Sequence, residues 1–340
     1  MKPNNKLKVG ILGCANIARR YSIKAFQALD NVEVAFIASR EVKKAEAWAL
    51  EFGIPNFGTY EELINNDQVE AVYIPLPIGL HKEWILKAAE SNKHIISEKS
   101  LAPDLESVKE IIAVCKKNGV VLFENFTCDY HPQHHQVVKM IQEGRIGEAH
   151  SFLSVYGFPI IADDNFRYKK ELGGSALNES GAYQVYTARK LFAREPVSVM
   201  ANLAFDLKSG VDMSGMVVMD FGNNLSAEFV FNMNAVYQNH YSVWGTQGLI
   251  KVGRAYAIPP DLKPLVEVVK NENRQETVTS IEVPASNHFQ AIFADFVSTI
   301  ISADNQKIQS VYESVLNQAR VLEAIRVANK ESRKVNLSEI

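Results

Sequence analysis

The feature that most constrains the fold is the stretch from Leu7 to Leu29, near the start of the 340-residue chain. An apolar run, Val9 to Leu12, leads into the short segment Gly13-Cys14-Ala15-Asn16. Apolar or aromatic side chains then recur every four residues, at Ile17, Tyr21, Ala25 and Leu29. This order predicts a strand, a tight turn and an amphipathic helix.

The turn has the spacing of a dinucleotide-binding turn. There the backbone must approach a pyrophosphate, and the free N–H groups of the following helix must point at it. Gly13 takes the first position of the G-x-G-x-x-G/A pattern, Ala15 replaces the second glycine and Ala18 is an allowed third residue. An ordinary strand-to-helix turn is the alternative. We predict that a cofactor binds here, through Gly13, Cys14, Ala15, Asn16 and Ile17.

Strand and helix patterns continue to alternate after this unit. Val32–Ala38 is a near-continuous apolar run, as expected for a parallel strand that is buried on both faces. Further strands are expected at 71–76, 94–97 and 120–123, with helical patterns at 41–52, 60–64, 79–90 and 105–115. The alternation predicts an α/β fold with a doubly wound parallel sheet, and ligands outside the carboxyl ends of its strands. We assign residues 1–124 to this cofactor-binding domain.

The end of the second predicted strand indicates which cofactor binds. Dinucleotide-binding folds usually place Asp or Glu there, to accept hydrogen bonds from the adenosine ribose. This chain has Ser39-Arg40 instead. A hydroxyl and a guanidinium suit a 2'-phosphate, which a carboxylate would repel. The residues favour NADP(H) over NAD, although Arg40 could also simply begin a solvated helix.

Several polar residues follow the predicted strands and should meet at one edge of the sheet. We expect Leu76, Pro77, His81, Glu98 and Lys99 to lie near the cofactor. A lysine directly after a buried strand is a catalytic candidate, because burial and neighbouring groups readily change its pKa. The alternative for Lys99 is an ordinary solvated side chain.

The pattern changes in residues 125–340, which we assign to a second domain. Period-two alternation, as in Val197 to Phe205 and Leu225 to Phe231, predicts a mostly antiparallel sheet with one buried face. The chain ends in helical patterns, one of which could pack back on the first domain. His131 and His135 have metal-ligand spacing on a predicted helix, but no carboxylate or cysteine partner is evident, so we predict no metal site.

A helical segment in this half, from Gly173 to Tyr183, carries a second catalytic candidate. Glu179 and Tyr183 are four residues apart and share a helix face, with small residues between them. A phenol can donate a proton to an oxygen that gains charge during hydride transfer. A nearby Lys99 ammonium would lower the pKa of such a phenol. A tyrosine that only packs the helix on the sheet is the alternative.

Composition excludes several classes of protein. The net charge of −3 gives no electrostatic reason to expect nucleic acid or an anionic membrane as a partner. No segment has the length of a membrane span. Three cysteines form an odd number without metal spacing, which suggests reduced thiols and a cytoplasmic protein.

Taken together, the motifs resemble those of the Gfo/Idh/MocA oxidoreductases over nearly the whole chain. The matching stretches are Gly13 to Ala18, Pro77 to His81, Glu98-Lys99-Ser100, Gly144 to Glu148 and Gly173 to Tyr183. The resemblance implies a Rossmann domain followed by an open-faced sheet domain that forms dimer or tetramer contacts.

The resemblance also implies roles for individual residues. The lysine of the family's E-K-P motif is Lys99, with Ser100 in place of the proline. The family's D-x-G-x-H motif falls on Glu179 to Tyr183, with glutamate and tyrosine at its ends. Tyrosine at that place is similar to the nucleotide-sugar 3-ketoreductases, glucose-fructose oxidoreductase and dihydrodiol dehydrogenases. We predict catalysis by Lys99 and Tyr183, and substrate contacts from Asn125, Arg167, Glu179 and Tyr183.

The stretches Gly13 to Arg20 and Glu124-Asn125-Phe126 resemble the branch that reduces a 3-keto group on a nucleotide-linked deoxysugar with NADPH. That reaction is our expected function. An aldose, cyclitol or trans-dihydrodiol dehydrogenase is one alternative. A non-catalytic NADP-binding regulator is another, which the presence of both Lys99 and Tyr183 disfavours.

Overall fold

The structure is a computed structural model that describes residues 6–162, 164–272 and 274–340. The chain forms two compact units. The first contains residues 1–126 and 289–316, and the second contains residues 127–288 and 317–340.

The first unit is built on a six-stranded, fully parallel sheet with the strand order β3-β2-β1-β4-β5-β6. The strands are β1 (Leu7–Leu12), β2 (Val32–Ala38), β3 (Asn56–Gly58), β4 (Ala71–Ile74), β5 (His94–Ser97) and β6 (Leu122–Glu124). The order runs outward from β1 in both directions, as in a doubly wound sheet. The predicted fold class of this half is therefore confirmed.

Helices alternate with these strands. They are α1 (Ile23–Gln27), α2 (Val42–Phe52), α3 (Tyr60–Ile64), α4 (Ile78–Glu90) and α5 (Leu105–Lys117). Local sequence sets their ends: Gly53 closes α2 with a φ of 65°, and Thr59 and Glu62 form a capping box at α3. The helix α8 (His288–Ser302) adds aromatic core, because Phe293 stacks on Phe26 with ring centroids 3.8 Å apart.

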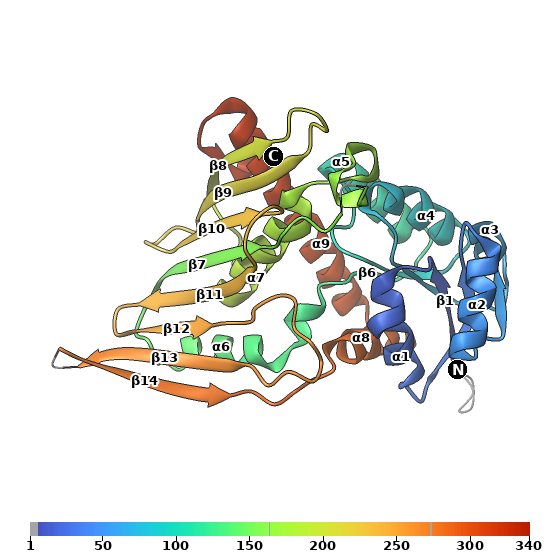
Figure 1. Ribbon diagram of the computed structural model, residues 1–340, viewed down its shortest axis with the longest axis horizontal. Coiled ribbons are helices and arrows are strands. Elements are labelled where there is room, and N and C mark those ends of the chain that lie inside the picture. Colours follow the sequence, from blue (N-terminus) through green and yellow to red (C-terminus); the bar gives the residue numbers. More distant parts are fainter. Residues whose placement is uncertain (1–5, 163, 273) are drawn as a thin grey trace. The chain divides into compact units, whose positions relative to one another are not determined.

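The second unit contains a nine-stranded sheet with the order β14-β13-β12-β11-β7-β10-β9-β8-β15. Figure 1 shows the strands from β14 to β8 side by side in this order, with β7 between β11 and β10. The pairs are antiparallel except for β7 and β10, which run parallel. The strands are β7 (Ala149–Gly157), β8 (Ser198–Phe205), β9 (Asp212–Asp220), β10 (Ser226–Asn232), β11 (Gln238–Gly245), β12 (Gly248–Val252), β13 (Leu265–Glu272), β14 (Gln275–Glu282) and β15 (Val335–Asn336). The predicted mostly antiparallel sheet is confirmed.

One face of this sheet is buried and the other is open. Along β10, Ala227, Phe229 and Phe231 are buried, while the side chains between them are exposed. The helix α7 (Ala182–Phe192) covers part of the buried face, where Gln184 Nε2 donates to Val230 O at 3.0 Å. The unit also contains α6 (Pro132–Gln142) and most of α9 (Asn305–Glu331). In the described ranges, no helix combines the length and apolar character needed to cross a membrane.

Candidate functional site

Most of the residues predicted to bind the cofactor follow strands of the parallel sheet. Gly13 to Ile17 follow β1, Ser39 and Arg40 follow β2, and Leu76 and Pro77 follow β4. Glu98 and Lys99 follow β5, and Asn125 follows β6. Because all six strands are parallel, these segments share the carboxyl edge of the sheet, where such folds bind their ligands.

The turn after β1 requires its glycine. Gly13 has a φ of +134°, and a Cβ atom placed there would lie 2.8 Å from Leu76 Cδ2. Burial raises the pKa of the neighbouring Cys14 to about 11, so its thiol remains protonated at neutral pH. The turn thus brings main chain close to the end of β4 and offers no reactive thiolate.

The loop after β2 carries the hydroxyl of Ser39 and the cationic side chain of Arg40. Ser39 is buried and its Oγ accepts from Glu41 N at 3.2 Å, while Arg40 is exposed. Burial raises the pKa of the Tyr60 phenol, and the nearby Arg40 guanidinium opposes this rise. Arg40 therefore lies close enough to Tyr60 for the two side chains to interact.

The segment that carries Lys99 is held by side chains from the neighbouring strands. Glu98 Oε1 accepts from Tyr73 Oη at 2.7 Å and from Asn125 Nδ2 at 2.6 Å. Ser22 Oγ in turn donates to Tyr73 Oη at 3.0 Å. Lys99 itself is only 8% exposed. Groups held by such networks are preorganised, which is what catalysis requires of them.

His81 contributes to the same loop from α4. The ring is fully buried, with Nε2 2.7 Å from Leu76 O and Nδ1 3.1 Å from Ser100 O. Burial lowers the pKa of the imidazole, and the main-chain carbonyls oppose this shift. Since both ring nitrogens face main-chain oxygens, His81 acts on the Lys99 segment by holding its backbone.

In the second unit, the structure brings together the residues predicted there. Arg167 Nε donates to Glu179 Oε2 at 2.9 Å, in a pair whose side chains are mostly buried. Tyr183 lies one helical turn beyond Glu179 and is partly exposed. Its ring centroid is 5.7 Å from those of Tyr156 and Tyr256, which are themselves 5.0 Å apart.

The two partner tyrosines differ from Tyr183 in burial. Burial raises the pKa of both Tyr156 and Tyr256, so both remain neutral phenols. Tyr256 Oη is also 2.6 Å from Ser154 Oγ. Within this cluster, Tyr183 is partly exposed and lies one helical turn beyond Glu179, whereas Tyr156 and Tyr256 are buried.

Sequence reasoning missed Tyr73, Tyr156 and Tyr256. Tyr73 lies inside a buried parallel strand. A buried hydroxyl needs a hydrogen-bond partner, so this position could have indicated a polar contact from the sequence. Tyr156 and Tyr256 lie on β7 and after β12, far apart in sequence, so their contact with Tyr183 could not be read from spacing.

Both candidate regions contain helix with π-type hydrogen bonding. One segment, Ala18–Ser22, follows the turn after β1, and the other, Leu177–Gly181, precedes Tyr183. Such segments interrupt regular helical spacing and occur frequently at functional sites.

At the start of α6, His131 and His134 are buried, whereas His135 is exposed. His134 Nε2 is 2.8 Å from Ala255 O and its Nδ1 is 3.0 Å from Tyr241 Oη. Burial lowers the pKa of His131 and of His134 to about 4 in each case. In the described part of the chain, no three His, Cys, Asp or Glu side chains are grouped so that they could hold a metal ion.

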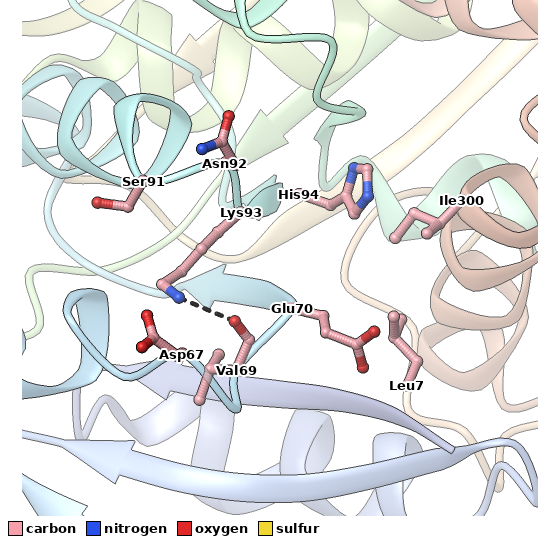
Figure 2. Close-up of a pocket in the computed structure, with 9 residues that line it drawn as sticks. All are labelled: Leu7, Asp67, Val69, Glu70, Ser91, Asn92, Lys93, His94 and Ile300. Atoms are coloured by element: carbon pink, nitrogen blue, oxygen red, sulfur yellow. Dashed lines mark hydrogen bonds between the residues drawn. The ribbon is translucent and has the colours of Figure 1, made fainter. Parts of the chain in front are cut away.

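A cavity of about 340 Å³ lies at the opposite, amino-terminal edge of the parallel sheet (Figure 2). Its basic side chains have protein partners. Lys93 Nζ donates to Val69 O at 2.8 Å and to Asn66 O at 2.9 Å, while His94 Nδ1 accepts from Val121 N. These groups satisfy the main chain of neighbouring loops, which is a structural role.

Comparison with known proteins identifies the family. Residues 7–126 match the oxidoreductase family with an NAD-binding Rossmann fold, and residues 134–251 match the GFO/IDH/MocA C-terminal domain. The dTDP-3,4-didehydro-2,6-dideoxy-alpha-D-glucose 3-reductase of Actinomadura kijaniata is 32% identical over 96% of this chain and 97% of its own. The D-xylose 1-dehydrogenase (NADP(+)) 2 of Haloferax volcanii is 35% identical over 74% of this chain and 77% of its own.

Solved structures agree with these relatives. A 3-ketoreductase from Actinomadura kijaniata in complex with NADP and TDP-benzene has a TM-score of 0.90 and 31% identity, covering 95% of this chain and 98% of that one. Structures of that enzyme also include variants with a tyrosine replaced by phenylalanine, or a lysine replaced by alanine or glutamate. The resemblance predicted from the motifs is confirmed, and the chain belongs to the Gfo/Idh/MocA family of oxidoreductases.

Proposed function

We propose that the protein is an NADPH-dependent oxidoreductase that reduces a 3-keto group on a nucleotide-linked deoxysugar. The observation that carries this proposal is the similarity, over nearly the full length of both chains, to a 3-reductase of a dTDP-linked dideoxysugar. The solved 3-ketoreductase with NADP and TDP-benzene supports the same cofactor and nucleotide class.

The residues of the first unit fit NADP(H). Gly13 has a φ of +134°, which residues with a side chain rarely adopt, as expected at a tight turn where main chain approaches a pyrophosphate. Ser39 and Arg40 would hold the 2'-phosphate, because a guanidinium pairs with phosphate oxygens in a bidentate fork. Cys14, Ala15, Asn16 and Ile17 would offer main-chain groups to the phosphates, and Leu76, Pro77 and Glu98 would border the nicotinamide half.

In this mechanism, NADPH supplies the hydride when it is bound. Tyr183 gives its phenolic proton to the oxygen of the carbonyl that is being reduced, and recovers a proton from solvent afterwards. Lys99 stabilises the negative charge that develops on this oxygen. Arg167 and Glu179 would orient the substrate as a pair, because the hydrogen bond between them limits the rotation of both side chains.

Substituting Arg40 tests the cofactor preference. We expect Arg40→Ala to weaken NADPH binding by about ten- to a hundredfold, the loss of a hydrogen bond to a charged group. NADH affinity should change little, because NADH has no 2'-phosphate. Fluorescence titration of both coenzymes measures the two dissociation constants, and an equal loss for both would contradict the role of Arg40.

A substrate panel tests the reaction itself. NADPH oxidation is followed with a dTDP-linked 3-keto deoxysugar, with the same sugar lacking its nucleotide, and with free aldoses and diols in the oxidising direction. The proposal expects turnover of the nucleotide-linked ketone and a large loss of kcat/KM without the nucleotide. Turnover of free sugars alone would favour the second candidate, an aldose dehydrogenase, which the similarity to a D-xylose 1-dehydrogenase supports. Tight NADPH binding without any turnover would favour a regulator.

We further propose a homodimer or homotetramer that forms through the open face of the nine-stranded sheet. The exposed side chains on this face include Met200, Met216, Val218, Val230 and Trp244. Met216 pairs across the strands with Val230, and Val218 with Met200, so these four apolar side chains are contiguous. Contiguous exposed apolar surface is typical of protein interfaces. A monomeric mass in multi-angle light scattering would contradict this proposal.

We place the protein in the cytoplasm, since Cys14, Cys115 and Cys128 are all free thiols. Immunoblotting of cell fractions would test this location.

A further inference from the structure

Asn125 has one side-chain atom that the protein does not satisfy. The residue directly follows β6 and is only 2% exposed. Its Oδ1 atom is buried and has no hydrogen-bond partner among the described residues. A buried amide oxygen without a partner costs free energy, so such an atom calls for an explanation.

The orientation of this amide is fixed by Glu98. The Asn125 Nδ2 atom lies 2.6 Å from Glu98 Oε1, and a carboxylate oxygen can only accept. The amide nitrogen must therefore face Glu98, which leaves Oδ1 on the other side. The backbone agrees, because Asn125 N donates to Ser97 O at 2.8 Å and holds the residue beside β5. The unpaired atom is thus a fixed acceptor at the carboxyl edge of the sheet.

The location of this acceptor indicates which group donates to it. In dinucleotide-binding folds each half of the sheet binds one mononucleotide. The candidate 2'-phosphate residue Arg40 follows β2, so the half with β4, β5 and β6 is left for the nicotinamide mononucleotide. The nicotinamide ring carries a primary carboxamide, whose NH₂ group is a strong donor and needs an acceptor when it is buried.

We propose that Asn125 Oδ1 accepts a hydrogen bond from the carboxamide NH₂ of the nicotinamide, with Glu98 as the residue that orients Asn125. This assignment rests on the proposed NADP(H)-dependent function. It makes Asn125 a cofactor-binding residue, in place of the substrate contact expected from the sequence. The carboxamide contact sets the rotation of the ring and therefore which of its faces is presented for hydride transfer.

Direct binding measurements test the proposal without catalysis. The probes are NADPH and its reduced 3-acetylpyridine analogue, in which a methyl group replaces the NH₂ donor. We expect the wild-type protein to bind the analogue about five- to a hundredfold more weakly than NADPH, the cost of an unpaired buried acceptor. In Asn125→Ala the acceptor is gone, so the two dissociation constants should differ by less than about twofold.

Two controls separate this role from damage to the fold. Tyr73→Phe removes another donor to Glu98 and leaves Asn125 in place, so its discrimination between the two probes should match the wild type. The second control is 2'-phospho-ADP-ribose, which lacks nicotinamide. It should bind Asn125→Ala and the wild type equally. Its weaker binding to Asn125→Ala would mean that the substitution acts on the whole coenzyme site, which contradicts the assignment.

The outcomes distinguish the inference from the proposed function. If the wild type binds both probes equally, or Asn125→Ala keeps the wild-type discrimination, Asn125 does not accept from the carboxamide. Either result would leave NADPH binding intact. A wild-type protein that binds no NADPH would instead overturn the proposed function, and the inference with it.

Discussion

Tyr183→Phe is expected to lower turnover by roughly a hundred- to ten-thousandfold, the contribution of a positioned general acid. The substitution removes only the hydroxyl, so the ring contacts with Tyr156 and Tyr256 should remain. Because burial raises the pKa of both neighbours, they are weaker acids than an ordinary phenol and should replace the lost proton donor poorly. Steady-state kinetics with NADPH and the nucleotide-linked ketone measure the effect.

A matched control for this substitution is Tyr156→Phe, which removes a hydroxyl from the same aromatic cluster. We expect a loss of turnover at least tenfold smaller than that of Tyr183→Phe. The dissociation constant of NADPH should be unchanged in both variants. Near-normal turnover in Tyr183→Phe would remove Tyr183 from the mechanism.

Lys99→Met is expected to lower kcat by about a hundred- to a thousandfold, the cost of losing one preorganised electrostatic group in an enclosed site. Methionine has a similar length and apolar character, so the mostly buried stem of Lys99 should pack much as before. The loss should fall on kcat more than on KM, because the ammonium acts on charge that develops in the transition state.

Lys99→Arg is the control, because it keeps the positive charge and changes its shape. We expect it to retain more activity than Lys99→Met. If the two variants lose the same activity while both keep their melting temperature and NADPH affinity, the charge of Lys99 has no catalytic role.

The parallel sheet was the most predictable part of the fold. Strands buried on both faces read as apolar runs, as in Val32–Ala38, whose predicted bounds agree with the structure. The short strand Asn56–Gly58 was missed, since three residues carry no periodicity. The strand Asp212–Asp220 was also missed, because Ser214 and Gly215 interrupt its apolar alternation.

The sequence patterns could not predict which distant strands pair. Nothing in the alternation of Ser226–Asn232 indicates that it runs parallel to Ala149–Gly157, because strand direction depends on how the chain connects them. The site followed the same division. Lys99 and Tyr183 were predicted as catalytic from strand ends, helix spacing and motifs, whereas the network from Tyr73 through Glu98 to Asn125 was not predicted.

The sequence alone determined the fold class, the family, and the edge of the parallel sheet at which ligands should bind. These properties depend on local apolar periodicity, on glycine at a strained turn and on short motifs. Each of these features spans only a short stretch of the sequence. The tertiary structure alone decided which polar atoms pair and which remain open, as at Asn125. Hydrogen-bond partners come from strands far apart in sequence, and only the folded sheet sets the distances between them.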